Sequence, residues 1–205
     1  ERSGAQDTLK VVGAIKRISH APTDPQAAAQ LLASGDIKIV SLTITEKGYY
    51  YTSSGDLDVN QPVIKAGLSA GAVPRSVFGY LFAAAEQRMA SNGPAFTVMS
   101  CDNLPGNGHL TRLLLLQFAE LKQPSHARWI ADNVSFPNSM VDRITPAVTE
   151  QTRAFVRDTF GVDDRCPVVS ESYLQWVLED NFANGRPGLE EVGVQITGDV
   201  EPYEK

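Results

Sequence analysis

Segments with strand character alternate with amphipathic helices through the middle of the chain. Residues 37–44 are rich in β-branched side chains and follow Gly35-Asp36, which predicts a strand. Residues 74–90 have the apolar spacing of a helix, residues 95–99 form a second apolar strand, and a helix with a broad apolar face follows over 108–121. This order is typical of βαβ units, so we expect an α/β fold with a Rossmann-like, doubly wound and mostly parallel sheet.

The flanking segments predict further elements. We expect a strand over 8–15, a helix through 27–32 that Asp24-Pro25 begins, a loop or hairpin over 48–62, a helix over 125–133, helices over 149–160 and 172–180, and short strands at 168–169 and 192–196. The order of elements changes after residue 146. We therefore predict a partial dinucleotide-binding domain over 1–146, incomplete at its N-terminal side. Residues 147–205 would hold its remainder and the start of a linker to a missing helical domain.

Composition and charge argue against several classes of function. The formal net charge of −6 argues against a nucleic-acid binder, because neutralising phosphates needs a basic surface. Apolar runs such as Leu113 to Leu116 are far too short to span a bilayer. The three histidines are scattered without a metal-ligand spacing, so a bound metal is not supported. Cys101 and Cys166 form no C-x-x-C motif, which favours reduced thiols in the cytoplasm.

One candidate site lies between the second predicted strand and the helix after it, in residues 100–108. Ligands of open α/β sheets bind beyond the carboxyl ends of strands, and Asn103 there offers both a donor and an acceptor. Gly106-x-Gly108 is not a dinucleotide fingerprint, because Thr111 replaces the third glycine and no acidic residue follows at the ribose-binding distance. The alternative is a turn with a helix cap. Cys101 is interpreted as a small apolar residue, since no histidine is placed to activate it.

Two further segments carry polar residues at places where a site is possible. Asp142-Arg143 lies between apolar residues and between Pro137 and Pro146, which indicates either a fixed polar site or a buried ion pair. Thr45-Glu46 ends the clearest strand, where a Rossmann-like sheet presents side chains to a nucleotide. The alternative there is a strand end with a surface salt bridge.

Taken together, these segments resemble the mannitol dehydrogenase family, the polyol-specific long-chain dehydrogenases and reductases. The resemblance runs through five blocks in the right order and covers nearly the whole chain: residues 43–49, 99–108, 134–146, 175–182 with 185–187, and 202–204. It implies NAD-dependent oxidation of a linear polyol, typically mannitol to fructose, by hydride transfer.

The resemblance also implies roles for single residues. Thr45 and Glu46 would line the nicotinamide side of the cofactor cleft, and Val141 and Asp142 would border the nicotinamide and the substrate hydroxyls. Asn103 would hydrogen-bond the reacting oxygen beside the cofactor, as an oxyanion hole does. Glu204 would lie beside the family's catalytic lysine and help to move the proton to solvent.

Other parts of the family's pattern would lie outside this sequence. They are the glycine-rich phosphate-binding turn, the acidic residue for the ribose, the catalytic lysine just past Lys205 with its asparagine and histidine, and the helical substrate domain. We therefore expect the 205-residue chain alone to be inactive. The resemblance also implies that the parent protein is monomeric. Two alternatives stay open: a fructuronate or tagaturonate reductase of the same family, and a non-catalytic nucleotide-binding or interaction remnant.

Overall fold

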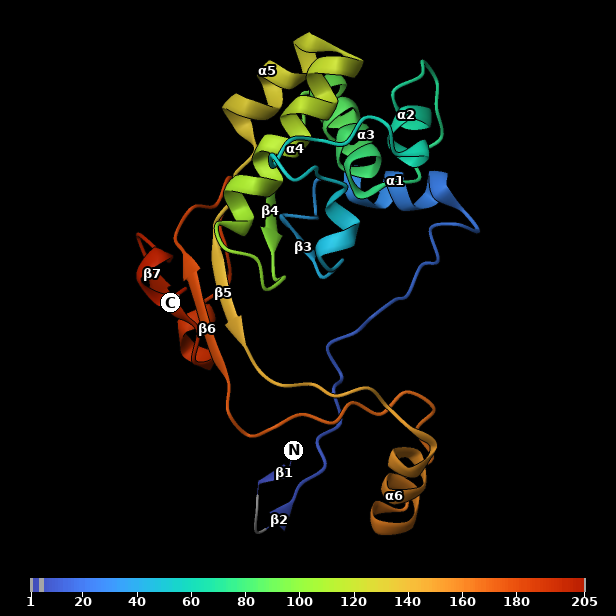
Figure 1. Cartoon of the computed structure of the whole chain (residues 1–205), viewed down its shortest axis with the longest axis vertical. Helices are drawn as coiled ribbons and strands as arrows, with labels where there is room; N and C mark the ends of the chain where they lie inside the picture. The colour runs from blue at the N-terminus through green and yellow to red at the C-terminus, as the bar shows by residue number, and fades with distance from the viewer. Residues whose placement is uncertain (1, 4–5, 205) are drawn as a thin grey trace. The chain divides into compact units, whose positions relative to one another are not determined.

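The computed structural model describes residues 2–3 and 6–204, in two compact units (Figure 1). The first unit comprises Glu1–Ile18 and Val141–Gln175, and the second comprises Ser19–Met140 and Trp176–Lys205. Lys205, to which no role is assigned, lies outside the described residues. The predicted domain boundary at residue 146 stays a prediction.

The second unit carries most of the α/β fold. In chain order its elements are α1 (Pro25–Ala33), β3 (Ile39–Leu42), η1 (Glu46–Tyr49), α2 (Pro62–Gly67), α3 (Val77–Ala90), β4 (Thr97–Ser100), α4 (Asn107–Lys122), α5 (Pro124–Asn133), the start of β5 (Ser139–Asp142), most of β6 (Gln175–Glu179), η2 (Leu189–Val192), β7 (Gln195–Thr197) and η3 (Glu201–Tyr203). The predicted alternation of helix and strand from residue 25 to residue 133 is confirmed. So is the turn in residues 48–62, where Tyr51 and Leu57 form an antiparallel bridge.

Two pairs of strands in this unit, β3 with β4 and β6 with β7, run parallel. β3 pairs with β4, from Ile39 opposite Thr97 to Leu42 opposite Ser100. Thr97 also bridges Ser135, just before β5, and β5, β6 and β7 form a three-stranded sheet in that order, with β6 and β7 parallel. Parallel strands need a crossover connection, which α2 and α3 supply between β3 and β4. The carboxyl ends of β3 and β4 therefore lie side by side.

Local sequence signals begin the helices of this unit. Asp24 accepts a hydrogen bond from the Ala27 N–H at 2.9 Å, and Pro25 occupies the first helical position of α1. Ser76 caps α3 in the same way, through the Gly79 N–H at 3.1 Å. Because the cap is Ser76, α3 begins three residues later than the apolar spacing predicts.

The helices pack on β3 and β4 around one large core. α3, α4 and α5 contact one another, and α4 contacts β4 (Figure 1). The largest fully buried apolar side chains of this core are Tyr49, Ile64, Phe78, Leu81, Phe82, Phe96, Leu114, Leu115, Phe118 and Ile130. A smaller cluster joins Met99 of β4 to Leu178 of β6 and Val194. All four residues of β4 are buried, so side chains become available to a ligand only beyond its carboxyl end.

A buried arginine lies at the edge of the large core. Arg88 of α3 is 1% exposed, and its guanidinium carbon lies 4.8 Å from the centre of the Phe96 ring. Its guanidinium donates to the carbonyls of Leu32, Ser34, Ile37 and Pro94 at 2.7–2.8 Å. The last carbonyls of a helix lack intrahelical donors and favour a nearby cation. Arg88 therefore joins the end of α1 to the chain that leads into β3.

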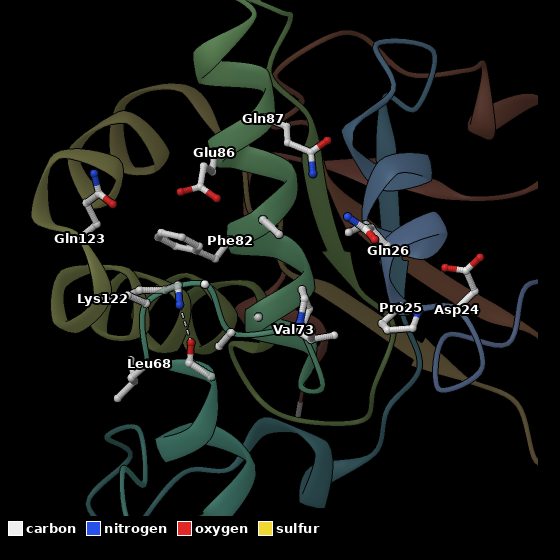
Figure 2. A pocket seen from close by; sticks show the side chains of 18 residues that line it. Asp24, Pro25, Gln26, Leu68, Val73, Phe82, Glu86, Gln87, Lys122 and Gln123 are labelled. Carbon is white, nitrogen blue, oxygen red and sulfur yellow. Dashed lines mark hydrogen bonds between the residues drawn. The ribbon is translucent and has the colours of Figure 1, made fainter.

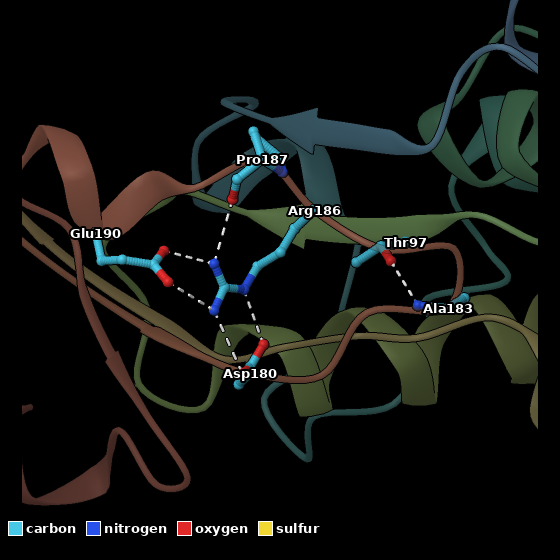
Figure 3. Close-up of polar contacts among 6 residues, drawn as sticks. All are labelled: Thr97, Asp180, Ala183, Arg186, Pro187 and Glu190. Carbon is cyan, nitrogen blue, oxygen red and sulfur yellow. Dashed lines mark hydrogen bonds and ion pairs between the residues drawn. The ribbon is translucent and has the colours of Figure 1, made fainter.

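A second arginine orders the turn between β6 and β7 (Figure 3). Arg186 forms ion pairs with Asp180 at 2.8 Å and with Glu190 at 2.6 Å, and it donates to the Pro187 carbonyl at 3.2 Å. The Ala183 N–H of the same turn donates to the Thr97 hydroxyl at 3.0 Å. This turn is thereby attached to the start of β4, the end opposite to Ser100.

The first unit contains β1 (Arg2–Ser3), β2 (Gln6–Asp7) and α6 (Glu150–Phe160), with a capping box of Thr149 and Thr152. α6 confirms the helix predicted over 149–160. The strand predicted over 8–15 is wrong: no described strand pairs with this segment, and its apolar side chains, such as Val11 at 81% exposed, face solvent. The strand at 168–169 is also wrong, since Val168 is exposed and unpaired with any described strand.

The helix predicted over 172–180 is a further error. Residues 175–179 form β6, which pairs with β7 from Val177 opposite Gln195. A short apolar run fits a buried strand as well as a helix, and here the pairing with β7 decides. β7 itself begins at Gln195, three residues later than expected, because Leu189–Val192 forms a 3-10 turn. Among the described residues, no helix is both long and apolar enough to cross a membrane.

Candidate functional site

The chain turns sharply where β3 ends. Thr45 has φ 60° and ψ 166°, a conformation that non-glycine residues rarely adopt and that costs on the order of 1–3 kcal/mol. The backbone N–H groups of Ile44 and Thr45 donate to the two carboxylate oxygens of Asp102, at 3.0 and 2.9 Å. Bonds to an ionised acceptor are stronger than neutral ones, so they hold the turn in this conformation. The side chains of Thr45 and Glu46 stay exposed.

Two hydroxyls complete the surroundings of the Asp102 carboxylate. The Tyr49 hydroxyl donates to Oδ2 of Asp102 at 2.7 Å, and it lies 2.5 Å from the hydroxyl oxygen of Ser100. Burial raises the pKa of Tyr49, and its contact with Asp102 raises it further. Tyr49 therefore stays protonated and can donate. We call Tyr49, Ser100, Asp102 and the N–H groups of Ile44 and Thr45 the Asp102 network.

Asn103 follows this carboxylate directly. Its side chain is exposed and has no hydrogen-bond partner in the described part of the chain, so its amide is available to a ligand. The neighbouring thiol of Cys101 is half-buried, and burial raises its pKa to about 11. The thiolate is the nucleophilic form, so this shift fits the interpretation of Cys101 as an apolar residue.

Glu204 lies at the start of α4. Gly106 adopts the left-handed conformation, with φ 59°, and its N–H donates to the Glu204 carboxylate at 2.9 Å. A negative charge is favoured at a helix N-terminus, where N–H groups lack intrahelical acceptors. The fold thus brings Glu204 to the loop that carries Asn103, although the two residues are far apart in sequence.

Asn107 attaches the same loop to β5. Its amide nitrogen donates to the carbonyls of Asp102 and Ser139, at 3.0 and 2.7 Å, and its amide oxygen accepts from the Ser139 N–H at 3.0 Å. The Ser139 hydroxyl donates to the Ser100 carbonyl. Both side chains are buried, so these bonds replace water and fix the end of β4 against β5.

Gly108 allows α4 to approach the chain before β5 closely. A Cβ atom at this position would lie 2.5 Å from the Pro137 carbonyl oxygen and 2.6 Å from that of Phe136. Thr111, the residue that breaks the dinucleotide pattern, is buried and donates to the Asn107 carbonyl at 2.6 Å. The two glycines of this segment therefore serve a helix start and a close packing contact.

This contact gives a test of the packing at the site. Gly108→Ala is expected to lower the free energy of unfolding by roughly 1–3 kcal/mol, because backbone atoms must move to admit the methyl group. Gly198→Ala is the matched control, since a Cβ atom there meets nothing within 4 Å and the backbone has no positive φ. Urea unfolding of both variants measures the difference. Equal stabilities would contradict the close contact.

One of the cavities of the second unit lies beside these elements. A cavity of about 630 Å³ is lined by residues of the turn after β3: Glu46, Lys47, Tyr50, Tyr51, Thr52, Ser53 and Gln61. Glu46 accepts a hydrogen bond from the Tyr51 hydroxyl there, at 2.9 Å. Another cavity of about 630 Å³ lies along α3, but Lys122 within it already donates to the carbonyls of Gly67 and Ser69, and no predicted site residue lines it (Figure 2).

Val141 and Asp142 lie at the end of β5, in the first unit. Val141 is half-buried and Asp142 is exposed, so Asp142-Arg143 is not a buried ion pair. Arg143 donates to the Glu171 carbonyl, at 2.9–3.0 Å. The roles of Val141 and Asp142 toward cofactor and substrate stay predictions.

Four of the predicted site residues belong to one region, because the Asp102 network joins Thr45 and Glu46 to Asn103, and Gly106 joins that loop to Glu204. Sequence reasoning missed the residues that hold this region together. They are Tyr49, Asp102, Asn107 and Ser139. Only Asp102 carries a signal of its own, as a carboxylate directly beyond a buried strand. Among the described residues, no group of three metal-ligating side chains is found.

Comparison with known proteins identifies similar sequences and structures. The profile of the mannitol dehydrogenase Rossmann domain matches residues 1–191. A mannitol dehydrogenase of Saccharomyces cerevisiae is 46% identical over 204 residues, which are 98% of this chain and 41% of that protein. The D-mannonate oxidoreductase of Escherichia coli is 44% identical over 204 residues, 98% of this chain and 42% of that protein.

A solved structure extends the likeness to the fold. The Pseudomonas fluorescens mannitol 2-dehydrogenase, in a ternary complex with NAD and D-mannitol, has a TM-score of 0.91 and 51% sequence identity. The match covers 94% of this chain and 39% of that one. The present chain thus spans about 41% of the length of the curated relatives that it matches. The predicted Rossmann-like fold class is confirmed.

Proposed function

Because this chain belongs to the mannitol dehydrogenase family, whose Rossmann domain it matches over residues 1–191, we propose that it is part of an NAD-dependent dehydrogenase of linear polyols. The reaction would oxidise a secondary alcohol of a polyol such as mannitol to the ketose, fructose in the case of mannitol. The chain would supply part of the cofactor cleft and part of the catalytic machinery.

The observation that carries this proposal is the gathering of polar side chains at the carboxyl ends of β3 and β4. Ligands of parallel α/β sheets bind at this edge. Thr45 and Glu46 remain exposed there, and the Asn103 amide has no partner among the described residues, so these groups fit a bound nicotinamide and alcohol. The mannitol 2-dehydrogenase that was solved with NAD and D-mannitol supports the same cofactor and substrate class.

The residues of this chain would have distinct roles. NAD, when bound, supplies the hydride acceptor. Thr45, Glu46 and Val141 would hold the nicotinamide, and Asp142 would orient the substrate hydroxyls. Asn103 would donate a hydrogen bond to the alcohol oxygen as negative charge develops on it, which lowers the barrier as an oxyanion hole does.

Glu204 would help to move the proton of the alcohol from the active site to solvent. Its Oε1 accepts the Gly106 N–H, and its other oxygen has no partner in the described part of the chain, so it is available to a proton donor. The base that takes the alcohol proton would be the family's lysine beyond Lys205. The 205 residues alone are therefore proposed to be inactive.

A uronate reductase is the second candidate. The observation that favours it is the D-mannonate oxidoreductase of E. coli, which is 44% identical over 98% of this chain. Fructuronate or tagaturonate would then be the substrate of reduction. The two candidates share the cofactor and differ in the substrate, which the helical domain outside this sequence would recognise.

One assay separates these candidates. The full-length protein is supplied with mannitol and NAD, and separately with mannonate and NAD, while NADH formation is followed at 340 nm; NADP replaces NAD in parallel. We expect turnover with mannitol and NAD, and none from the 205-residue chain. Turnover with mannonate alone would assign the uronate activity. A full-length protein that is inactive with both substrates would favour a non-catalytic remnant.

We also propose that the protein is cytoplasmic and that its full-length form is a monomer. Cys101 and Cys166 are free thiols, and Cys166 is exposed, which suits a reducing compartment. The monomeric state rests on the family resemblance.

A further inference from the structure

Asp102 occupies an unusual place between the two strands that carry the site. The ladder between β3 and β4 ends with the Cys101 N–H, which donates to the Leu42 carbonyl at 2.8 Å. Beyond that point the side chain of Asp102 replaces the ladder, since its two oxygens accept the next backbone N–H groups of the β3 side, those of Ile44 and Thr45. One carboxylate therefore fixes two consecutive peptide groups.

The peptide groups that it fixes carry the predicted cofactor residues. Thr45 has a positive φ, and only surrounding bonds make such a conformation persist in a non-glycine residue. Without these bonds the turn is expected to relax toward an extended conformation, which would redirect the side chains of Thr45 and Glu46. Asp102 itself is half-buried, and its oxygens are occupied by protein donors.

Tyr49 supports this arrangement from the core. It is 0% exposed, and its hydroxyl donates to Oδ2, the oxygen that also accepts the Ile44 N–H. Since a carboxylate can only accept and Tyr49 has one hydrogen, the hydroxyl of Ser100 donates to Tyr49. The donors all point toward Asp102, so the carboxylate is held in one orientation.

We propose that Asp102 is a positioning residue for the cofactor: it sets the conformation of the turn at Thr45-Glu46 without touching cofactor or substrate. This inference rests on the proposed function. It predicts that loss of the carboxylate weakens the binding of NADH more than it weakens the use of the polyol.

The test compares Asp102→Asn with the wild type in the full-length protein. An asparagine amide replaces one acceptor oxygen by an NH2 group, which cannot accept from a backbone N–H. We expect the Kd of NADH, measured by nicotinamide fluorescence, to rise about tenfold or more, and the KM of NAD to rise with it. The KM of the polyol is expected to change less than about threefold.

Two further variants separate positioning from a general loss of stability. Arg186→Gln breaks the ion pairs at the opposite end of β4, so it is expected to lower the melting temperature and leave the Kd of NADH within about twofold. Tyr49→Phe removes one of the three donors to Asp102 and is expected to raise the Kd about threefold. In the double variant Tyr49→Phe should add nothing to Asp102→Asn, because it acts through the same carboxylate.

Each outcome of these measurements either supports or overturns the positioning role of Asp102. An unchanged Kd in Asp102→Asn, or an equal rise in Arg186→Gln, overturns the positioning role while wild-type turnover leaves the proposed function intact. A wild-type protein that binds no nicotinamide cofactor overturns both. If Asp102→Asn fails to fold, Tyr49→Phe provides the answer: a raised Kd supports the role, and an unchanged Kd overturns it.

Discussion

Replacement of Asn103 by alanine in the full-length protein is expected to lower kcat for polyol oxidation about 100-fold or more. The Asn103 amide is exposed at the carboxyl end of β4 and has no partner among the described residues, so it is free to donate to the reacting oxygen. A bond that strengthens as the alkoxide develops stabilises the transition state more than the bound alcohol. The loss should therefore appear in kcat and in kcat/KM together, with little change in KM.

The control for this variant is an asparagine outside the site. Asn133 ends α5 and is exposed, and its amide donates to the Trp129 carbonyl at 2.8 Å. Asn133→Ala is expected to leave kcat unchanged. Steady-state rates of NADH formation measure both variants. An Asn103→Ala enzyme with wild-type kcat would refute the role of Asn103, and a large loss of stability in that variant would assign it to the fold instead.

Replacement of Arg88 by methionine is expected to lower the free energy of unfolding by roughly 3 kcal/mol or more. Methionine keeps much of the side-chain volume but donates no hydrogen bonds. The carbonyls of Leu32, Ser34, Ile37 and Pro94 would then lose their guanidinium donor, and each unsatisfied buried acceptor costs about 1–3 kcal/mol.

The matched control is an arginine on the surface of the same unit. Arg128 of α5 is exposed, so Arg128→Met is expected to change the free energy of unfolding by less than about 0.5 kcal/mol. Urea unfolding of the full-length protein, with both variants measured side by side, provides the comparison. A difference below about 1 kcal/mol between Arg88→Met and wild type would mean that water replaces the guanidinium at little cost.

These two predictions differ in what the sequence could reveal. Asn103 was identified from its place after an apolar strand and from the block of residues around it. Arg88 was not, because the helical spacing of residues 74–90 marks only apolar positions and an arginine is expected at the surface. Its burial follows from the end of α1 and the chain before β3, which only the folded structure brings to it.

The same difference applies to the site: its candidate residues could be predicted from the sequence, and their hydrogen-bond partners could not. Residue types and order were enough to propose Thr45, Glu46, Asn103 and Glu204, together with the family to which they belong. The partners that hold them could not be predicted, since Asp102 lies 57 residues from Thr45, and Glu204 lies 98 residues from Gly106. Periodicity reports how apolar and polar residues alternate within one segment. It carries no information on which donor forms a hydrogen bond with which distant acceptor.

By itself the sequence predicted α1, β3, α3, β4, α4 and α5, because caps and apolar spacing act within a few residues along the chain. The tertiary structure decided the segments whose conformation depends on a distant partner. Residues 175–179 form a strand because β7 lies beside them, whereas residues 8–15, although rich in β-branched side chains, pair with no described strand. The physical reason is that a helix satisfies its backbone groups within its own segment, whereas a strand needs the hydrogen bonds of a neighbour.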